Sequence, residues 1–127
     1  MKHRMLLRFA ERTQFMIETR DDETDTVTGL LESLPFESAV NRWGEEIYFD
    51  APFSSPLEAD ARAEMDVGEV AFWPTGNALA IFFGPTPAST GPRPRAYSEC
   101  NLVGRVLENA SELTGIAPGT SVRIERA

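Results

Sequence analysis

The chain contains only one cysteine, Cys100, and one histidine, His3. A single cysteine excludes an internal disulfide, and we expect Cys100 to be a buried, unreactive thiol in a reducing compartment. One histidine and one cysteine cannot build a metal site from nitrogen and sulfur ligands, so we expect no metal and no cofactor. A serine–histidine–aspartate triad is not expected either, because its base would have to come from His3 beside the terminus.

Long apolar runs and concentrated positive charge are also lacking. No stretch approaches the roughly 20 apolar residues that cross a bilayer, and the apolar stretch after His3 is broken by Arg8. We therefore expect a cytoplasmic protein without a membrane partner. The net charge is −8 and both signs are spread along the chain. A nucleic-acid partner is not expected, because such binding needs a concentrated cationic face.

The length and the composition indicate a single domain. The chain has 127 residues, of which 42% are hydrophobic, and it contains no internal repeat. A chain of this size buries enough surface to form one core without disulfides or metals. We therefore predict one domain over residues 1–127.

One helix is predicted over residues 24–34, directly after the acidic segment 21–25. Thr24 or Asp25 can cap its first turn, and Pro35 ends it because the residue before a proline disfavours helical geometry. The acidic segment suits the positive end of the helix dipole, so it needs no metal ion. Four apolar residues share one face of this helix at helical spacing. They are Val27, Leu30, Leu31 and Leu34.

Elsewhere the apolar pattern has a period of two, which is typical of β-strands. The predicted strands are 5–10, 15–19, 38–43, 46–50, 63–65, 69–73, 79–83, 102–107 and 122–126, with a hairpin turn at 11–13 and a helical turn at 111–113. So many short strands favour a mainly β fold in which closure removes exposed sheet edges. We predict a closed antiparallel β-barrel of about eight strands with one or two short capping helices.

Four segments carry a resemblance to a known family. They are PFESAVNRWGEEIYF at 35–49, GEVAFWPTGNA at 68–78, FFGPTP at 82–87 and NLVGRV at 101–106. In this order they resemble the small cyclophilin-like domains of bacterial and archaeal proteins of unknown function, over nearly the whole chain. The resemblance implies an eight-stranded barrel, similar to cyclophilin with its longer loops shortened.

The same resemblance argues against catalysis. It implies that the arginine and the glutamine of cyclophilins are replaced by Ser38 and Ile81, and the pocket histidine by Cys100 or Asn101. We therefore expect little or no prolyl isomerase activity and no catalytic residue.

Glu46 and Asp50 share one strand face, but an acid–base pair needs a cleft and a raised pKa, so we expect surface or structural carboxylates.

Aromatic residues in these segments provide the candidate site. Most must be core residues, but Trp43 and Trp73 adjoin Gly44 and Pro74 and are expected at strand ends, where large rings cover a groove. An arginine beside aromatics favours ligands that bear a carboxylate, because guanidinium offers paired donors. The predicted ligand-binding residues are Asn41, Arg42, Trp43, Glu46, Tyr48, Phe72, Trp73, Phe82 and Phe83.

The sequence therefore predicts a non-catalytic module that binds a small molecule or a proline-containing peptide in this groove. The alternative function is a divergent peptidyl-prolyl isomerase without the usual arginine. It would use an apolar site to lower the barrier to cis–trans rotation of the prolyl peptide bond, which is about 20 kcal/mol. A hydrolase, or a subunit that acts only with a partner, is a third class. The oligomeric state is left open.

Overall fold

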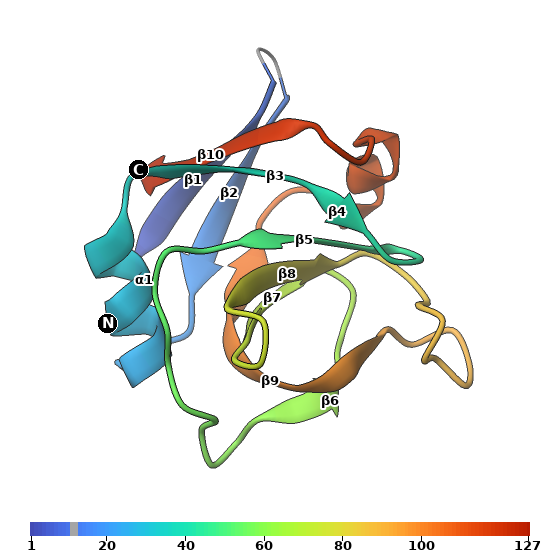
Figure 1. Ribbon diagram of the computed structural model, residues 1–127, viewed down its shortest axis with the longest axis horizontal. Coiled ribbons are helices and arrows are strands. Elements are labelled where there is room, and N and C mark those ends of the chain that lie inside the picture. The colour runs from blue at the N-terminus through green and yellow to red at the C-terminus, as the bar shows by residue number, and fades with distance from the viewer. Residues whose placement is uncertain (11–12) are drawn as a thin grey trace.

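The described part of the chain is mainly β, as predicted, with one α-helix and one 3-10 helix (Figure 1). The computed structural model describes residues 1–10 and 13–127. The first elements are β1 (Arg4–Phe9), β2 (Thr13–Thr19), α1 (Asp25–Ser33), β3 (Phe36–Ala39), β4 (Asn41–Arg42) and β5 (Glu46–Asp50). They are followed by β6 (Arg62–Glu64), β7 (Glu69–Trp73), β8 (Ala78–Phe82), β9 (Arg95–Val106), η1 (Ala110–Gly115) and β10 (Ser121–Arg126). Residues 11 and 12 of the predicted hairpin turn lie outside the described residues.

All the strand pairs are antiparallel and form one sheet of ten strands in the order β3-β10-β1-β2-β9-β7-β8-β5-β4, with β6 paired to β9. The prediction of a closed barrel of eight strands was therefore wrong in strand number and in closure. The predicted strand 38–43 divides at Val40, so that β3 pairs with β10 while β4 pairs with β5. The backbone of Val40 instead bonds to Gly119 and Thr120. The first and last strands of this order, β3 and β4, are therefore neighbours in the sequence. No strand ladder joins them to each other in the described part of the chain.

Helix α1 confirms the predicted helix to within one residue at each end. The side-chain oxygen of Thr24 accepts the N–H of Val27 at 3.1 Å, which satisfies one free donor of the first turn. Leu30 and Leu31 are buried, and Leu34 packs against the same core. Figure 1 shows α1 on the left side of the view and η1, in red-orange, on the right. None of the helices in the described residues is long and apolar enough to span a bilayer.

Strand β8 separates two apolar clusters. Its side chains alternate between faces, so Leu79 and Ile81 join the main core while Ala80 and Phe82 join a smaller cluster on the other face. Every residue of β8 is buried, which shows that both faces are covered. Strand β9 begins at Arg95, seven residues before the predicted strand. Its first half covers the smaller cluster, next to the candidate site.

Candidate functional site

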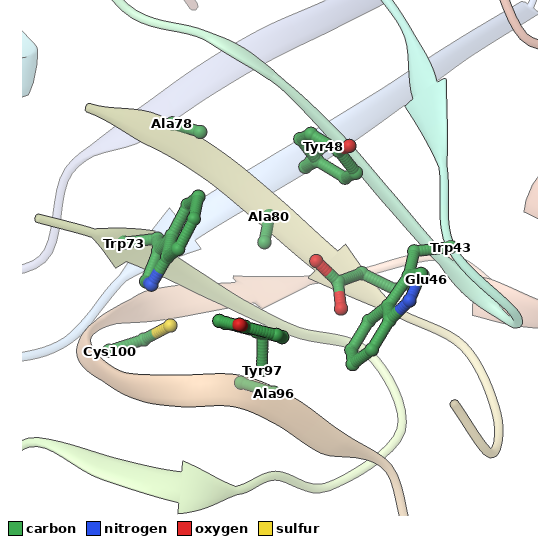
Figure 2. Close-up of a pocket in the computed structure, with 9 residues that line it drawn as sticks. All are labelled: Trp43, Glu46, Tyr48, Trp73, Ala78, Ala80, Ala96, Tyr97 and Cys100. Atoms are coloured by element: carbon green, nitrogen blue, oxygen red, sulfur yellow. The ribbon is translucent and has the colours of Figure 1, made fainter. Parts of the chain in front are cut away.

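A pocket of about 280 Å³ lies on the face of β8 opposite the main core (Figure 2). Strands β5, β7, β8 and β9 and the turn before β5 supply its lining residues. We call it the aromatic pocket. Its lining consists of Trp43, Glu46, Tyr48, Trp73, Ala78, Ala80, Ala96, Tyr97 and Cys100.

The hollow exists because small and large side chains alternate across neighbouring strands. Tyr48 lies opposite Ala80 in the β5–β8 ladder, and Trp73 lies opposite Ala78 in the β7–β8 ladder. Residues that are directly opposite in a ladder share one face of the sheet. The two alanines, together with Ala96, leave a shallow floor that the neighbouring rings surround.

Three aromatic side chains form a connected rim. Tyr97 meets Trp43 edge-on at 6.0 Å between ring centroids and meets Trp73 edge-on at 5.9 Å, within the range that aromatic pairs prefer. The indole N–H of Trp73 donates to the hydroxyl oxygen of Ser98 at 2.6 Å. A Cβ on Gly76 would lie 2.5 Å from the Trp73 ring, so the glycine allows a close approach. Trp73 is therefore held in position from two sides.

Glu46 is the single acidic side chain in the lining. It is only 7% exposed, and its Oε1 atom is buried without a hydrogen-bond partner. Burial raises the pKa of Glu46 to about 8, because desolvation disfavours the charged form. Glu46 is therefore not a surface carboxylate, whereas Asp50 is exposed. Figure 2 shows the Glu46 carboxyl group directed into the space between the rings.

A tight turn places Trp43 beside Glu46. The backbone N–H of Trp43 donates to the Glu46 carbonyl at 2.9 Å, and the backbone N–H of Glu46 donates to the Trp43 carbonyl at 3.2 Å. Gly44 inside this turn has a φ of +59°, a conformation that side chains disfavour. The turn therefore explains why an indole and a buried carboxyl group reach the same pocket from nearby positions in the sequence.

Cys100 lies in the pocket and is 2% exposed, so the thiol is buried as predicted. Burial, with a smaller contribution from the charge of Glu46, raises its pKa to about 12. Its Sγ donates to the Ser98 carbonyl at 3.4 Å. The neutral thiol is therefore the stable form, which is opposite to what nucleophilic catalysis needs.

Arg42 is not part of the pocket lining. Its Nε donates to the Gly44 carbonyl at 3.0 Å and its Nη1 donates to the Thr114 carbonyl at 2.8 Å. Its guanidinium carbon also lies 5.0 Å from the centroid of the Phe83 ring. No ion pair joins Arg42 to Glu46. Asn41 is exposed on β4 and is not part of the lining.

The three predicted phenylalanines are buried rather than exposed in the pocket. Phe72 stacks on Phe53 at 4.5 Å between centroids, inside the main core that also holds Phe83. Phe82 belongs to the smaller cluster. Of the nine predicted residues, the structure brings four together in the pocket lining. These are Trp43, Glu46, Tyr48 and Trp73.

Sequence reasoning missed five lining residues, namely Ala78, Ala80, Ala96, Tyr97 and Cys100. For the floor a signal existed, because residues 78–81 alternate between alanine and a large aliphatic side chain. Tyr97 gave no such signal, since its place depends on strand β9 starting earlier than predicted. Within residues 1–10 and 13–127, no group of three histidine, cysteine or acidic side chains is placed to hold a metal ion.

Comparisons with known proteins agree with this fold. A family model described as cyclophilin-like matches residues 3–125. The solution structure of a hypothetical protein from Archaeoglobus fulgidus is similar, with 35% sequence identity and a TM-score of 0.82 over 99% of this chain and 95% of that chain. No curated protein matches the chain. The similarity therefore covers the strands that line the pocket but transfers no activity.

Proposed function

The chain belongs to the cyclophilin-like family, and we propose that it is a non-catalytic binding module that holds a small molecule in the aromatic pocket. The buried, unpartnered Oε1 of Glu46 is the observation that carries this proposal. Buried polar atoms in folded proteins nearly always have a hydrogen-bond partner. A ligand in the pocket would supply the missing one.

The size and the chemistry of the pocket support the same proposal. Its volume of about 280 Å³ lies near the lower end of the roughly 300–1,000 Å³ of typical ligand sites. Four aromatic rings offer a large contact area at little cost in side-chain entropy. A small ligand, or one side chain of a peptide such as a proline ring, fits this space better than a long polymer.

Another surface hollow is a weaker candidate. It is lined by residues 61–64 together with Arg93, Arg95 and Glu99. Both Arg93 and Arg95 already pair with Glu64, at 3.1 and 3.5 Å. Its charges are therefore largely neutralised within the protein, whereas the carboxyl group of the aromatic pocket has no basic partner.

Ligand-observed NMR with a library of metabolites and prolyl dipeptides tests the proposal. Hits are then titrated against two variants that change the pocket in opposite ways. Trp73→Ala removes a wall, and Ala80→Leu fills the floor without removing a contact. Leu57→Ala is the control, because Leu57 is 54% exposed and outside the lining.

We expect both pocket variants to weaken binding by at least about tenfold, while the control leaves it unchanged. Circular dichroism and a one-dimensional proton spectrum establish that each variant is folded. If hits bind both pocket variants as well as the parent protein, the aromatic pocket is not the binding site. A library without a single hit would also reject the proposal.

A further inference from the structure

We propose that the aromatic pocket is selective for an organic cation, a methylated ammonium group that carries at least one N–H, with Glu46 as its counter-ion. This inference rests on the proposed binding function and adds the chemical class of the ligand. It reverses the ligand charge expected from the sequence, because that expectation placed Arg42 in the groove.

The arrangement of the rings is the first argument. Trp43, Tyr97 and Trp73 form one connected rim, and Tyr48 stands across the alanine floor (Figure 2). Aromatic faces attract cations through their quadrupole, and tryptophan is the strongest such partner. Methyl groups on a cationic nitrogen add apolar contact with the same rings. A pocket built from two indoles and two phenols therefore suits a methylated ammonium group.

The charge of the lining is the second argument. Glu46 is its single acidic side chain, and the lining contains no lysine or arginine. The nearby Arg42 is held by the carbonyl groups of Gly44 and Thr114. A ligand carboxylate would therefore meet a carboxyl group and ring faces without a cation to pair with. The net charge of −8 also attracts cations to the protein from a distance.

The unpartnered oxygen of Glu46 explains why an N–H is required. Oε1 is buried and accepts no hydrogen bond. A quaternary ammonium can neutralise the charge of the carboxylate but has no N–H to donate. A protonated secondary or tertiary amine supplies both the charge and the donor. Hydrogen bonds to charged groups are among the stronger ones in proteins, so the N–H should raise the affinity measurably.

The protonation state of Glu46 is consistent with this role. Glu46 has a pKa of about 8 and is mostly protonated at neutral pH, which avoids an unpaired buried charge. Tyr48, Tyr97 and Cys100 are the other titratable side chains of the lining, and burial keeps the Cys100 thiol neutral. A bound cation would replace the proton of Glu46. At pH values below the pKa of this group, binding should therefore release a proton.

Three small probes with the same hydroxyethyl tail separate charge from shape. Dimethylethanolamine, when protonated, carries one N–H, and choline carries the charge without an N–H. The neutral alcohol in which carbon replaces the nitrogen of choline has the shape without the charge. Each is titrated by calorimetry near pH 8, about the pKa of Glu46. We expect the amine to bind about tenfold more tightly than choline, and choline more tightly than the alcohol.

Glu46→Gln is the decisive variant because it keeps the shape of the side chain and removes its charge. It should abolish the preference for the amine over the neutral alcohol. Asp50→Asn is the matched control, since it makes the same charge change at an exposed position on the same strand and outside the lining. It should retain the full preference.

The outcomes distinguish this inference from the proposed function. If the neutral alcohol binds as tightly as the amine, the cation preference is wrong, while the pocket is still a binding site. Cation probes that fail to bind at millimolar concentration also overturn the inference, and the metabolite screen then decides the binding function alone. A capped dimethyl-lysine, compared with dimethylethanolamine, shows whether a free amine or a modified lysine side chain fits better, and tight binding of either supports the inference.

Discussion

Cys100 and Glu46 line the same pocket, and burial disfavours the ionised form of each side chain. Burial is the larger cause of the raised pKa of the Cys100 thiol, about 12, and the charge of Glu46 is the smaller cause. Burial alone raises the pKa of Glu46 to about 8. Both side chains are therefore mainly neutral at neutral pH, and an ionised Glu46 carboxylate in this pocket needs a cationic partner.

The first prediction is that Cys100 reacts very slowly with iodoacetamide in the folded protein. The thiolate is the reactive form, and a pKa of about 12 in place of 9.0 lowers its fraction by about a thousandfold at pH values below both. Mass spectrometry follows the labelling of the folded protein and of the same protein in urea. A labelling rate for the folded protein equal to that of the unfolded chain would contradict the burial of this thiol.

The second prediction concerns the pH dependence of stability. The pKa of Glu46 is about 8 in the folded protein, against 4.5 for an unperturbed glutamate. Between these values the folded state keeps a proton that the unfolded state releases, so this group lowers the free energy of unfolding as the pH rises. The loss is complete somewhat above pH 8 and amounts to about 5 kcal/mol.

Glu46→Gln removes this titration, so its stability relative to the parent protein should increase steadily from about pH 5 to about pH 8. Urea unfolding of both proteins at several pH values measures the difference. Asp50→Asn, at an exposed position on the same strand, is the matched control. If the difference between Glu46→Gln and the parent protein is constant over this pH range, Glu46 is not protonated in the folded state.

Local signals predicted the local elements well. The helix after Thr24 needs only a cap, a 3.6-residue apolar pattern and Pro35, all of which lie within a dozen residues. Strands β5 and β7 have the predicted bounds for the same reason, since their alternation is complete within five residues. Closure of the sheet into a barrel was wrongly predicted, because it depends on the hydrogen-bond partners of the Val40 backbone. These partners lie near residue 120, far from Val40 in the sequence.

The site was predicted only in part, because its chemistry depends on contacts between distant segments. The aromatic residues near Gly44 and Pro74 signalled a groove, and Trp43 and Trp73 do line it. Arg42 is bound to the carbonyl of Thr114, 72 residues along the chain, which no spacing rule could show. Burial of Glu46 likewise depends on how β5, β8 and β9 pack together.

The third prediction tests the position of the helix. Leu31 is 6% exposed and packs in the main core, so Leu31→Ala should lower the free energy of unfolding by about 2–5 kcal/mol. Leu57→Ala, at an exposed position, should change it by less than about 0.5 kcal/mol. Urea denaturation monitored by tryptophan fluorescence provides both values. A loss below about 1 kcal/mol for Leu31→Ala would show that the helix does not cover the core.

The fourth prediction is that the protein has little or no prolyl isomerase activity. The positions that resemble the cyclophilin arginine and glutamine are Ser38, on β3, and Ile81, which is fully buried in the main core. Neither residue is part of the pocket lining. At the histidine position, Asn101 donates from its side-chain amide to Thr26 and to the Pro56 carbonyl, and the alternative residue, Cys100, donates from its thiol to the Ser98 carbonyl. No polar donor at these positions is therefore available to a prolyl peptide bond in the pocket.

Loss of one preorganised donor typically lowers a catalysed rate by about two to three orders of magnitude, so loss of all three should leave almost no acceleration. A protease-coupled assay with a proline-containing peptide measures the rate, with a cyclophilin as the positive control. We expect a rate indistinguishable from the uncatalysed isomerisation. The two pocket variants, Trp73→Ala and Ala80→Leu, serve as a further control. If the pocket catalyses isomerisation, the rate must be lower in both variants than in the parent protein. Turnover close to that of the cyclophilin, lost in these variants, would make the protein a divergent isomerase and overturn its assignment as a non-catalytic module.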